Sequence, residues 1–138
     1  MVLFDNSIIR LDYAPASDIL AAEYPDLHDF LLPDIKRSLD TLVDTVTHYD
    51  VKRLLLDSTR TVTTVCEEAG KDIAAHLAAG LMKTRVEKVA RVQSVSPTVE
   101  STAQKNIEHV RQSVSLPFEL RNFTSRTEAV EWLLGRLY

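Results

Sequence analysis

The sequence predicts a single α/β domain with a mixed, mostly parallel sheet, an N-terminal antiparallel hairpin and about four helices. Leu54, Leu55 and Leu56 are consecutive, and a strand that is apolar on both faces belongs to the centre of a sheet covered by helices. From there on, strand patterns alternate with helix patterns, which favours right-handed crossovers between parallel strands. The pair Asp5-Asn6 tolerates left-handed backbone and separates two apolar segments, which predicts the hairpin.

The two strands of this hairpin are expected at residues 2–4 and 7–13. In the second of them, Ile9, Leu11 and Tyr13 alternate with more polar neighbours. Such alternation predicts a strand with one buried face and one wetter face.

A third strand is expected at residues 18–24, and Pro25 ends it. The first long helix is expected to begin at Pro33, because proline suits the first helical position. Apolar residues at helical spacing predict its buried face: Ile35, Leu39, Leu42, Val43, Val46 and Tyr49. The segment Tyr24–Leu32 follows neither pattern, and a flap over a cavity is one interpretation of it.

The central strand, residues 51–57, is followed by the polar run Ser58–Thr61 and a second helix. Thr64 and Glu67 have the spacing of a capping box, in which each side chain bonds the backbone N–H of the other residue. Gly80 is expected to end this helix. Small residues that should let the helix lie close to the sheet are Gly70, Ala74 and Ala78.

The next strand is expected at residues 86–95, beside the central strand. Ser96 and Pro97 then predict a helix start, with a cap followed by the first helical position. Residues 117–121 alternate between apolar and polar side chains, as an outer strand does.

Ser125 and Glu128 form a second capping box ahead of a last helix, and Trp132 is expected to anchor that helix in the core. The predicted order of elements is therefore β-β-β-α-β-α-β-α-β-α. Such an order gives one layer of sheet covered by helices.

Length and composition indicate one soluble domain over residues 1–138. A net charge of −4 argues against nucleic acid as the main partner, since no basic excess neutralises phosphates. No apolar run reaches the length of a membrane span, and no basic segment precedes an apolar one at the start of the chain. A cytoplasmic location is therefore expected, without a signal peptide and without a membrane-spanning segment.

The residue types that carry most metal and catalytic chemistry are sparse. The four histidines lack i, i+4 spacing, so no metal ligands are assigned. Cys66 is the only cysteine and has no evident catalytic partner, which favours a packed thiol. No nucleophile motif or phosphate-binding glycine loop is present, so no catalytic residue and no cofactor are assigned.

Three features together resemble a known family. They are the hairpin at the start, the strand Arg53-Leu-Leu-Leu-Asp57 with its polar loop, and the ending Phe123-Thr-Ser-Arg-Thr-Glu-Ala-Val-Glu-Trp-Leu133. The chain resembles the SpoIIAA-like, or STAS-like, family of small bacterial α/β domains, and most closely its stand-alone branch. The resemblance implies a regulatory or protein-interaction role, because the family includes anti-sigma-factor antagonists.

One motif of those antagonists is missing. They carry an Asp-Ser-Ser-Gly-like motif at the start of the second long helix, where a serine is phosphorylated. The corresponding stretch here is Thr61-Val-Thr-Thr64, without glycine. Thr63 and Thr64 remain as candidate phosphate acceptors.

Parallel βα units bring helix starts to the carboxyl edge of a sheet, where free N–H groups and helix dipoles favour anions. Polar residues of Ser58–Thr64, Ser94–Thr98 and Asn122–Ser125 should converge there. Alternatively, the hydroxyls cap their own helices. The candidate ligand or partner site consists of Asp57, Ser58, Arg60, Thr61, Thr63, Thr64, Ser96, Thr98, Asn122 and Ser125.

The first functional hypothesis is a non-enzymatic regulatory or protein-interaction domain that binds another protein or a second copy of itself as a homodimer. The second is a carrier or sensor of a small apolar or anionic ligand, by analogy with lipid-carrier domains. An unidentified enzyme activity is the third.

Overall fold

The structure, a computed structural model, describes residues 1–6, 8–24, 26, 32–61 and 67–136. The elements follow the predicted order along the chain. They are β1 (Val2–Asp5), β2 (Arg10–Ala14), β3 (Ile19–Glu23), α1 (Leu32–His48), β4 (Arg53–Asp57), α2 (Glu67–Leu81), β5 (Lys88–Val92), α3 (Pro97–Ser113), β6 (Glu119–Phe123) and α4 (Arg126–Leu133).

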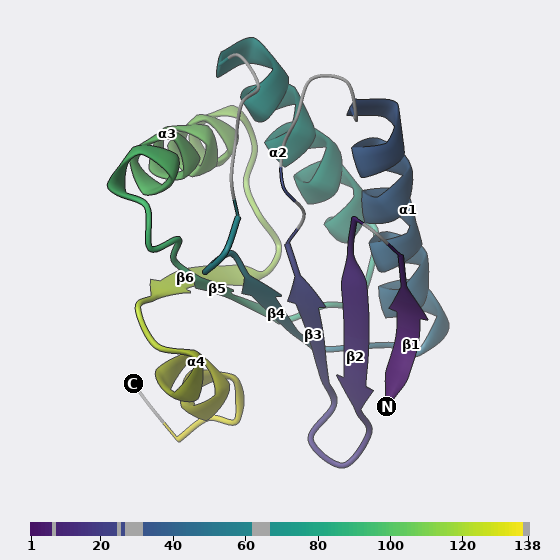
Figure 1. The fold of residues 1–138 in the computed structure, drawn as a ribbon. Helices are drawn as coiled ribbons and strands as arrows, with labels where there is room; N and C mark the ends of the chain where they lie inside the picture. The colour runs from purple at the N-terminus through teal and green to yellow at the C-terminus, as the bar shows by residue number, and fades with distance from the viewer. Residues whose placement is uncertain (7, 25, 27–31, 62–66, 137–138) are drawn as a thin grey trace.

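The strands form one six-stranded sheet in the order β1-β2-β3-β4-β5-β6, so chain order and sheet order coincide (Figure 1). β1 pairs with β2 and β2 with β3 in antiparallel fashion, whereas β3, β4, β5 and β6 pair in parallel. The predicted mixed sheet, its N-terminal hairpin and the central position of β4 are thereby confirmed.

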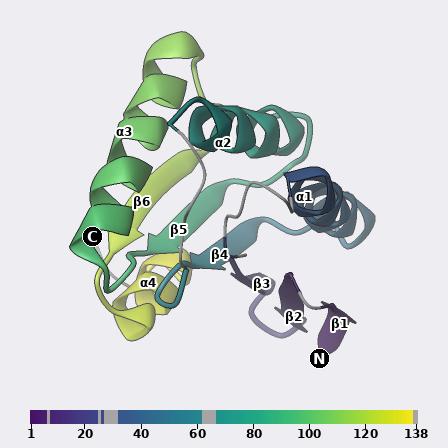
Figure 2. The same ribbon diagram turned by 45° about the horizontal axis from the view of Figure 1, so that its top comes forward.

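The covering of the two faces follows from the strand order. Each parallel strand adds to the same side of the previous one, and right-handed crossovers therefore place α1, α2 and α3 on one face. α4 follows β6 and packs on β4, β5 and β6 from the opposite face, as Figure 2 shows. Because the strand order never reverses, the sheet has no switch point at which neighbouring crossovers diverge to opposite faces.

The central strand is buried on both faces, as its three leucines predicted. Leu54 and Leu56 are 0% and 6% exposed and belong to the core beneath α1 and α2. Leu55 is 1% exposed and belongs to the second core, which Trp132 of α4 completes. Trp132 is itself buried against the Phe123 ring, at 5.6 Å between centroids, so its predicted role as a core anchor is confirmed.

The bounds of all six strands differ by one to three residues from the sequence prediction, and two of these differences have an identifiable cause. β2 begins at Arg10, because the Asn6 side chain accepts hydrogen bonds from the N–H groups of Ile8 and Ile9 and extends the turn. β6 spans Glu119–Phe123, two residues further along the chain than expected. Alternation alone does not set its register, which comes from pairing with β5 up to Phe123 beside Val92.

The expectation that Gly80 ends the second helix was wrong, because α2 continues to Leu81. Gly80 instead lies where α2 meets α1, and a Cβ there would be 2.8 Å from a Val43 methyl carbon. Gly70 faces α3 rather than the sheet, since its nearest side-chain neighbour is Asn106. Both glycines therefore serve helix–helix contact and not a helix end.

Gly80→Ala is expected to destabilise the protein, although alanine is the better helix former by about 1 kcal/mol. The added methyl group overlaps Val43, and such overpacking costs about 1–3 kcal/mol. Urea unfolding measures the change in free energy of unfolding. The double variant Gly80→Ala with Val43→Ala is the control, and a single variant as stable as the parent would contradict the close contact.

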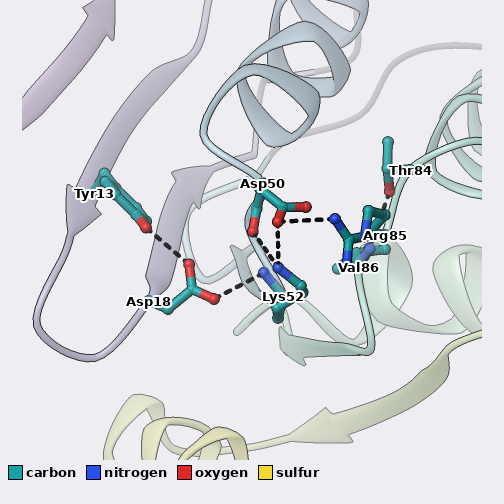
Figure 3. Close-up of polar contacts among 7 residues, drawn as sticks. All are labelled: Tyr13, Asp18, Asp50, Lys52, Thr84, Arg85 and Val86. Carbon is teal, nitrogen blue, oxygen red and sulfur yellow. Dashed lines mark hydrogen bonds and ion pairs between the residues drawn. The ribbon is translucent and has the colours of Figure 1, made fainter.

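A charged network closes the amino edge of the parallel strands (Figure 3). Asp18 and Asp50 both have left-handed backbone, with φ of 54° and 51°. The Asp18 carboxylate accepts from the Tyr13 hydroxyl at 2.8 Å and from the Lys52 N–H at 3.1 Å. Asp50 forms ion pairs with Lys52 and Arg85. The polar side chains at the amino edge therefore bond to one another. The candidate site lies at the opposite edge of the sheet, where the parallel strands end.

Candidate functional site

The loops that follow β4, β5 and β6 lie side by side at the carboxyl edge of the sheet. The Ser58 N–H donates to the Val92 carbonyl at 3.0 Å, and the Val95 N–H donates to the Thr59 carbonyl at 3.3 Å. The Gln93 N–H donates to the carbonyl of Phe123, the last residue of β6, at 2.8 Å. The described parts of the three polar segments are therefore neighbours. We call this surface, formed by residues 57–61, 93–98 and 122–126, the carboxyl edge.

Asp57 fixes the first of these loops. Its carboxylate accepts from the Thr59 N–H at 3.0 Å and from the Thr59 hydroxyl at 2.5 Å, and it pairs with Arg126 at 2.9 Å. Burial raises the pKa of Asp57, but these hydrogen bonds and the Arg126 charge outweigh burial, so the pKa is lowered overall. The ionised Asp57 side chain thus links the end of β4 to the start of α4.

The two predicted serine caps are present. The Ser96 hydroxyl accepts from the Val99 N–H and caps α3, and the Ser125 hydroxyl accepts from the Glu128 N–H and caps α4. Each of these contacts measures 3.4 Å. At these positions the hydroxyls satisfy the N–H groups of their own helices, which leaves fewer donors for an anion.

Other predicted site residues point inward. Ser58 and Thr61 are 3% and 6% exposed. The Thr61 hydroxyl donates to the Tyr24 carbonyl at 3.3 Å, and the Asn122 side-chain oxygen accepts from Arg91 at 3.2 Å. These groups hold the edge together from within.

Among the described members of the predicted set, Arg60 and Thr98 face solvent most openly. Thr63 and Thr64, the candidate phosphate acceptors, lie outside the described residues, as do most of the proposed Tyr24–Leu32 flap and Cys66. Their proposed roles stay predictions.

A polar cleft of about 590 Å³ runs beside the carboxyl edge, between the first loop and the N-terminal hairpin. Its walls carry charges of both signs, so it does not present a purely cationic surface. The charged residues along it are Asp5, Arg10, Glu23, Asp26, Asp57, Arg60 and Arg126.

A buried ion pair that the sequence did not indicate lies beneath this edge. Arg91 of β5 binds both oxygens of Glu100 of α3, at 2.8 and 2.9 Å, and the two side chains are 9% and 16% exposed. Glu100 also accepts from Gln104 at 2.5 Å and from the Ser94 N–H at 2.9 Å. Burial raises the pKa of Glu100, but these partners outweigh burial and lower it overall.

An apolar cavity of about 130 Å³ lies between the sheet and the helix pair α2–α3. Side chains from β4, β5, α2, α3 and β6 line it, together with Tyr24. Burial raises the pKa of Tyr24 to about 12, with the Arg91 charge acting in the opposite direction. Tyr24 therefore stays a neutral wall of the cavity at physiological pH.

Two signals in the sequence pointed to these interior groups. Arg91 follows Val89 by two residues, so both lie on the face of β5 that α2 and α3 cover. Asn106 stands on the apolar stripe of α3 between Ala103 and Val110 and is 7% exposed. A polar residue at a position that periodicity assigns to the core points to a specific role more strongly than an apolar residue does there.

Among the described residues, no group of three His, Cys, Asp or Glu side chains is arranged to hold a metal ion. Over the same part of the chain, no helix has both the length and the apolar character to span a membrane.

No protein-family model matches the sequence, and no match is found among curated proteins. One similar solved structure is the crystal structure of the diguanylate cyclase SiaD in complex with its activator SiaC from Pseudomonas aeruginosa. The match has 17% identity and a TM-score of 0.38, and it covers 89% of this chain and 99% of the other. At that similarity it supports neither a family nor a function.

Proposed function

We propose that this protein is a non-enzymatic regulatory or protein-interaction domain of STAS-like type, and that its carboxyl edge binds a partner protein or a second copy of itself. The observation that carries the proposal is the edge itself. Backbone hydrogen bonds hold its loops together, and it presents Arg60, Thr98 and Val95 to solvent. Val95 is 79% exposed, the most exposed large apolar side chain among the described residues.

Rigidity and composition make this edge suitable for binding. A surface that is ordered before binding loses little conformational entropy when a partner docks. An arginine beside an apolar side chain also matches the composition of interface cores, where arginine is enriched and lysine depleted. Arg60 and Val95 come from adjacent loops, so one partner surface can contact both.

Photo-crosslinking tests the proposal. A benzophenone amino acid replaces Val95 in the protein expressed in its native cells, and a matched variant carries it at the exposed Lys83, beyond the last turn of α2. We expect a discrete adduct from position 95, whose yield Arg60→Ala lowers several-fold, and no such adduct from position 83. Arg37→Ala, an exposed change on α1, is the control for loss of charge.

The mass of the adduct distinguishes the two kinds of partner. A product of twice the chain mass, together with concentration-dependent sedimentation, indicates a homodimer. Equal adduct patterns from both positions, or an adduct insensitive to Arg60→Ala, would show that the carboxyl edge is ordinary surface.

A carrier or sensor of a small ligand is the second candidate function, and the apolar cavity is the observation that favours it. Pockets of this kind, with mostly apolar walls and a few polar groups, are typical of small-molecule sites. Tyr24, the first residue of the segment interpreted as a flap, is among the residues that line this cavity.

A further inference from the structure

Small side chains on the two helices leave room for the apolar cavity. Ala74 and Ala78 of α2 face Ala103 of α3 across it, above Leu56 and Val89 of the sheet. Protein interiors are packed as densely as organic crystals, and an unfilled space of this size costs stability. Leucine at any of the three alanine positions would occupy much of the space, so the sequence keeps the cavity open where common core residues would close it.

Asn106 supplies a hydrogen-bond acceptor to this cavity. The residue is 7% exposed and lines the cavity, and its side-chain oxygen is buried without a hydrogen-bond partner among the described residues. Gly70 leaves the room that the amide occupies, since a Cβ on Gly70 would lie 3.0 Å from the Asn106 nitrogen. Nearly all buried polar atoms in folded proteins are paired, so an unpaired oxygen in a cavity indicates a missing donor.

The charge in the cavity wall is already balanced. Arg91 lines the cavity, but Glu100 neutralises it through two hydrogen bonds, and Asn122 accepts a further bond from the same guanidinium. Arg91 is the one charged side chain among the described lining residues. An anionic ligand would have to compete with Glu100, whereas a neutral ligand leaves the ion pair intact.

We propose that this cavity binds a small neutral molecule with an apolar body, the size of one ring or a short chain, and one hydroxyl or N–H group that donates to the Asn106 oxygen. An apolar cavity of about 150 Å³ holds one benzene ring, which sets the scale for the 130 Å³ found here. The inference deepens the second candidate function. It does not depend on the protein-interaction role of the carboxyl edge.

Three one-ring probes test the ligand class by titration of the ¹⁵N-labelled protein, observed through its amide shifts. Phenol has the donor, anisole has a similar shape without it, and benzoate carries a charge. We expect phenol to shift the amides of Ala74, Ala103 and Asn106. Anisole should bind about threefold to tenfold more weakly, the value of one hydrogen bond. Benzoate should cause no shifts at these residues.

Variants then assign the contacts. Ala74→Leu fills the cavity and should abolish the shifts from phenol and anisole, whereas Ala79→Leu on the exposed side of α2 should leave them unchanged. Asn106→Leu, similar in shape but without an acceptor, should remove the preference for phenol over anisole. Its melting temperature should rise, because the unpaired polar atom is gone.

Failure is also well defined. If no probe shifts the cavity amides of the folded parent, the space holds water or nothing, and the site is overturned. Binding that survives Ala74→Leu places the ligand elsewhere and has the same consequence. If the parent protein binds phenol and anisole with equal affinity, the Asn106 oxygen does not accept a hydrogen bond from the ligand, and that part of the proposal is overturned. Each of these results leaves the Val95 crosslinking unaffected, so failure of this site is distinguishable from failure of the interaction role.

Discussion

Leu55→Ala is expected to lower the free energy of unfolding by about 2–5 kcal/mol. Leu55 is 1% exposed and lies at the centre of the sheet, between Ala21 of β3 and Ala90 of β5. Its side chain belongs to the core that α4 covers, together with Phe123 and Trp132. Its neighbours in the adjacent strands are small, so they cannot fill the space that the leucine leaves. The loss is a large share of the stability of a domain of this size.

Urea unfolding followed by circular dichroism measures this loss. Val95→Ala removes exposed apolar carbon of similar kind and should change the free energy of unfolding by less than about 0.5 kcal/mol. Equal midpoints for Leu55→Ala and Val95→Ala would show that the face beneath α4 is not a core.

Glu100→Gln is expected to cost about 3 kcal/mol, the lower end of the range for breaking a buried ion pair. The change leaves the Arg91 charge buried without its counter-ion, and it weakens the bond from the Ser94 N–H. The lower end applies because the Glu100 side chain keeps 16% exposure, so water compensates part of the loss. Thermal and urea unfolding at pH 7 measure the change.

The same variant should respond differently to acid. The pKa of Glu100 is lowered in the folded protein, so its ionised form stabilises the fold fully above the unfolded pKa of about 4.3. That contribution disappears as pH falls through the lower folded value. The stability difference between parent and Glu100→Gln should therefore shrink below about pH 4.3, whereas acid loss from Asp57 affects both proteins alike.

Two further variants define what these measurements mean. Glu108→Gln changes an exposed carboxylate on the same helix and should leave both stability and its acid dependence almost unchanged. Combining Arg91→Met with Glu100→Leu removes both charges and should recover much of the loss. A Glu100→Gln protein as stable as the parent at pH 7 would show that the pair contributes nothing.

The sequence was sufficient to predict an element where its hydrophobic pattern and its local turn or cap residues indicate the same structure. Leu54, Leu55 and Leu56 could only be accommodated between two covered faces, and Ser96 with Pro97 marked the start of α3 to the residue. These signals are local, because a cap or an alternating strand depends on neighbours within a few residues.

The rest depended on partners distant in the sequence. Gly80 has the character of a helix end, yet its role is set by Val43 of another helix. The pairing of Arg91 with Glu100 results from how α3 lies on the sheet, which no spacing specifies. The burial of Asn106, in contrast, follows from its place on the apolar stripe of α3. Topology predicted that the loops after β4, β5 and β6 lie side by side, as backbone hydrogen bonds between their described parts show. The bonds from Arg91 to Asn122 and from Thr61 to the Tyr24 carbonyl, by contrast, depend on partners that the sequence does not indicate.

The coincidence of chain order and sheet order has a consequence for synthesis on the ribosome. Each new strand can pair with the one made just before it, so the sheet can grow from β1 towards β6 as the chain emerges. α4 emerges after all of them and covers the face that contains Leu55, Ala90 and Val92. A nascent or prematurely stopped chain without Arg126–Leu133 would expose that apolar face, so this short helix protects the finished sheet from aggregation.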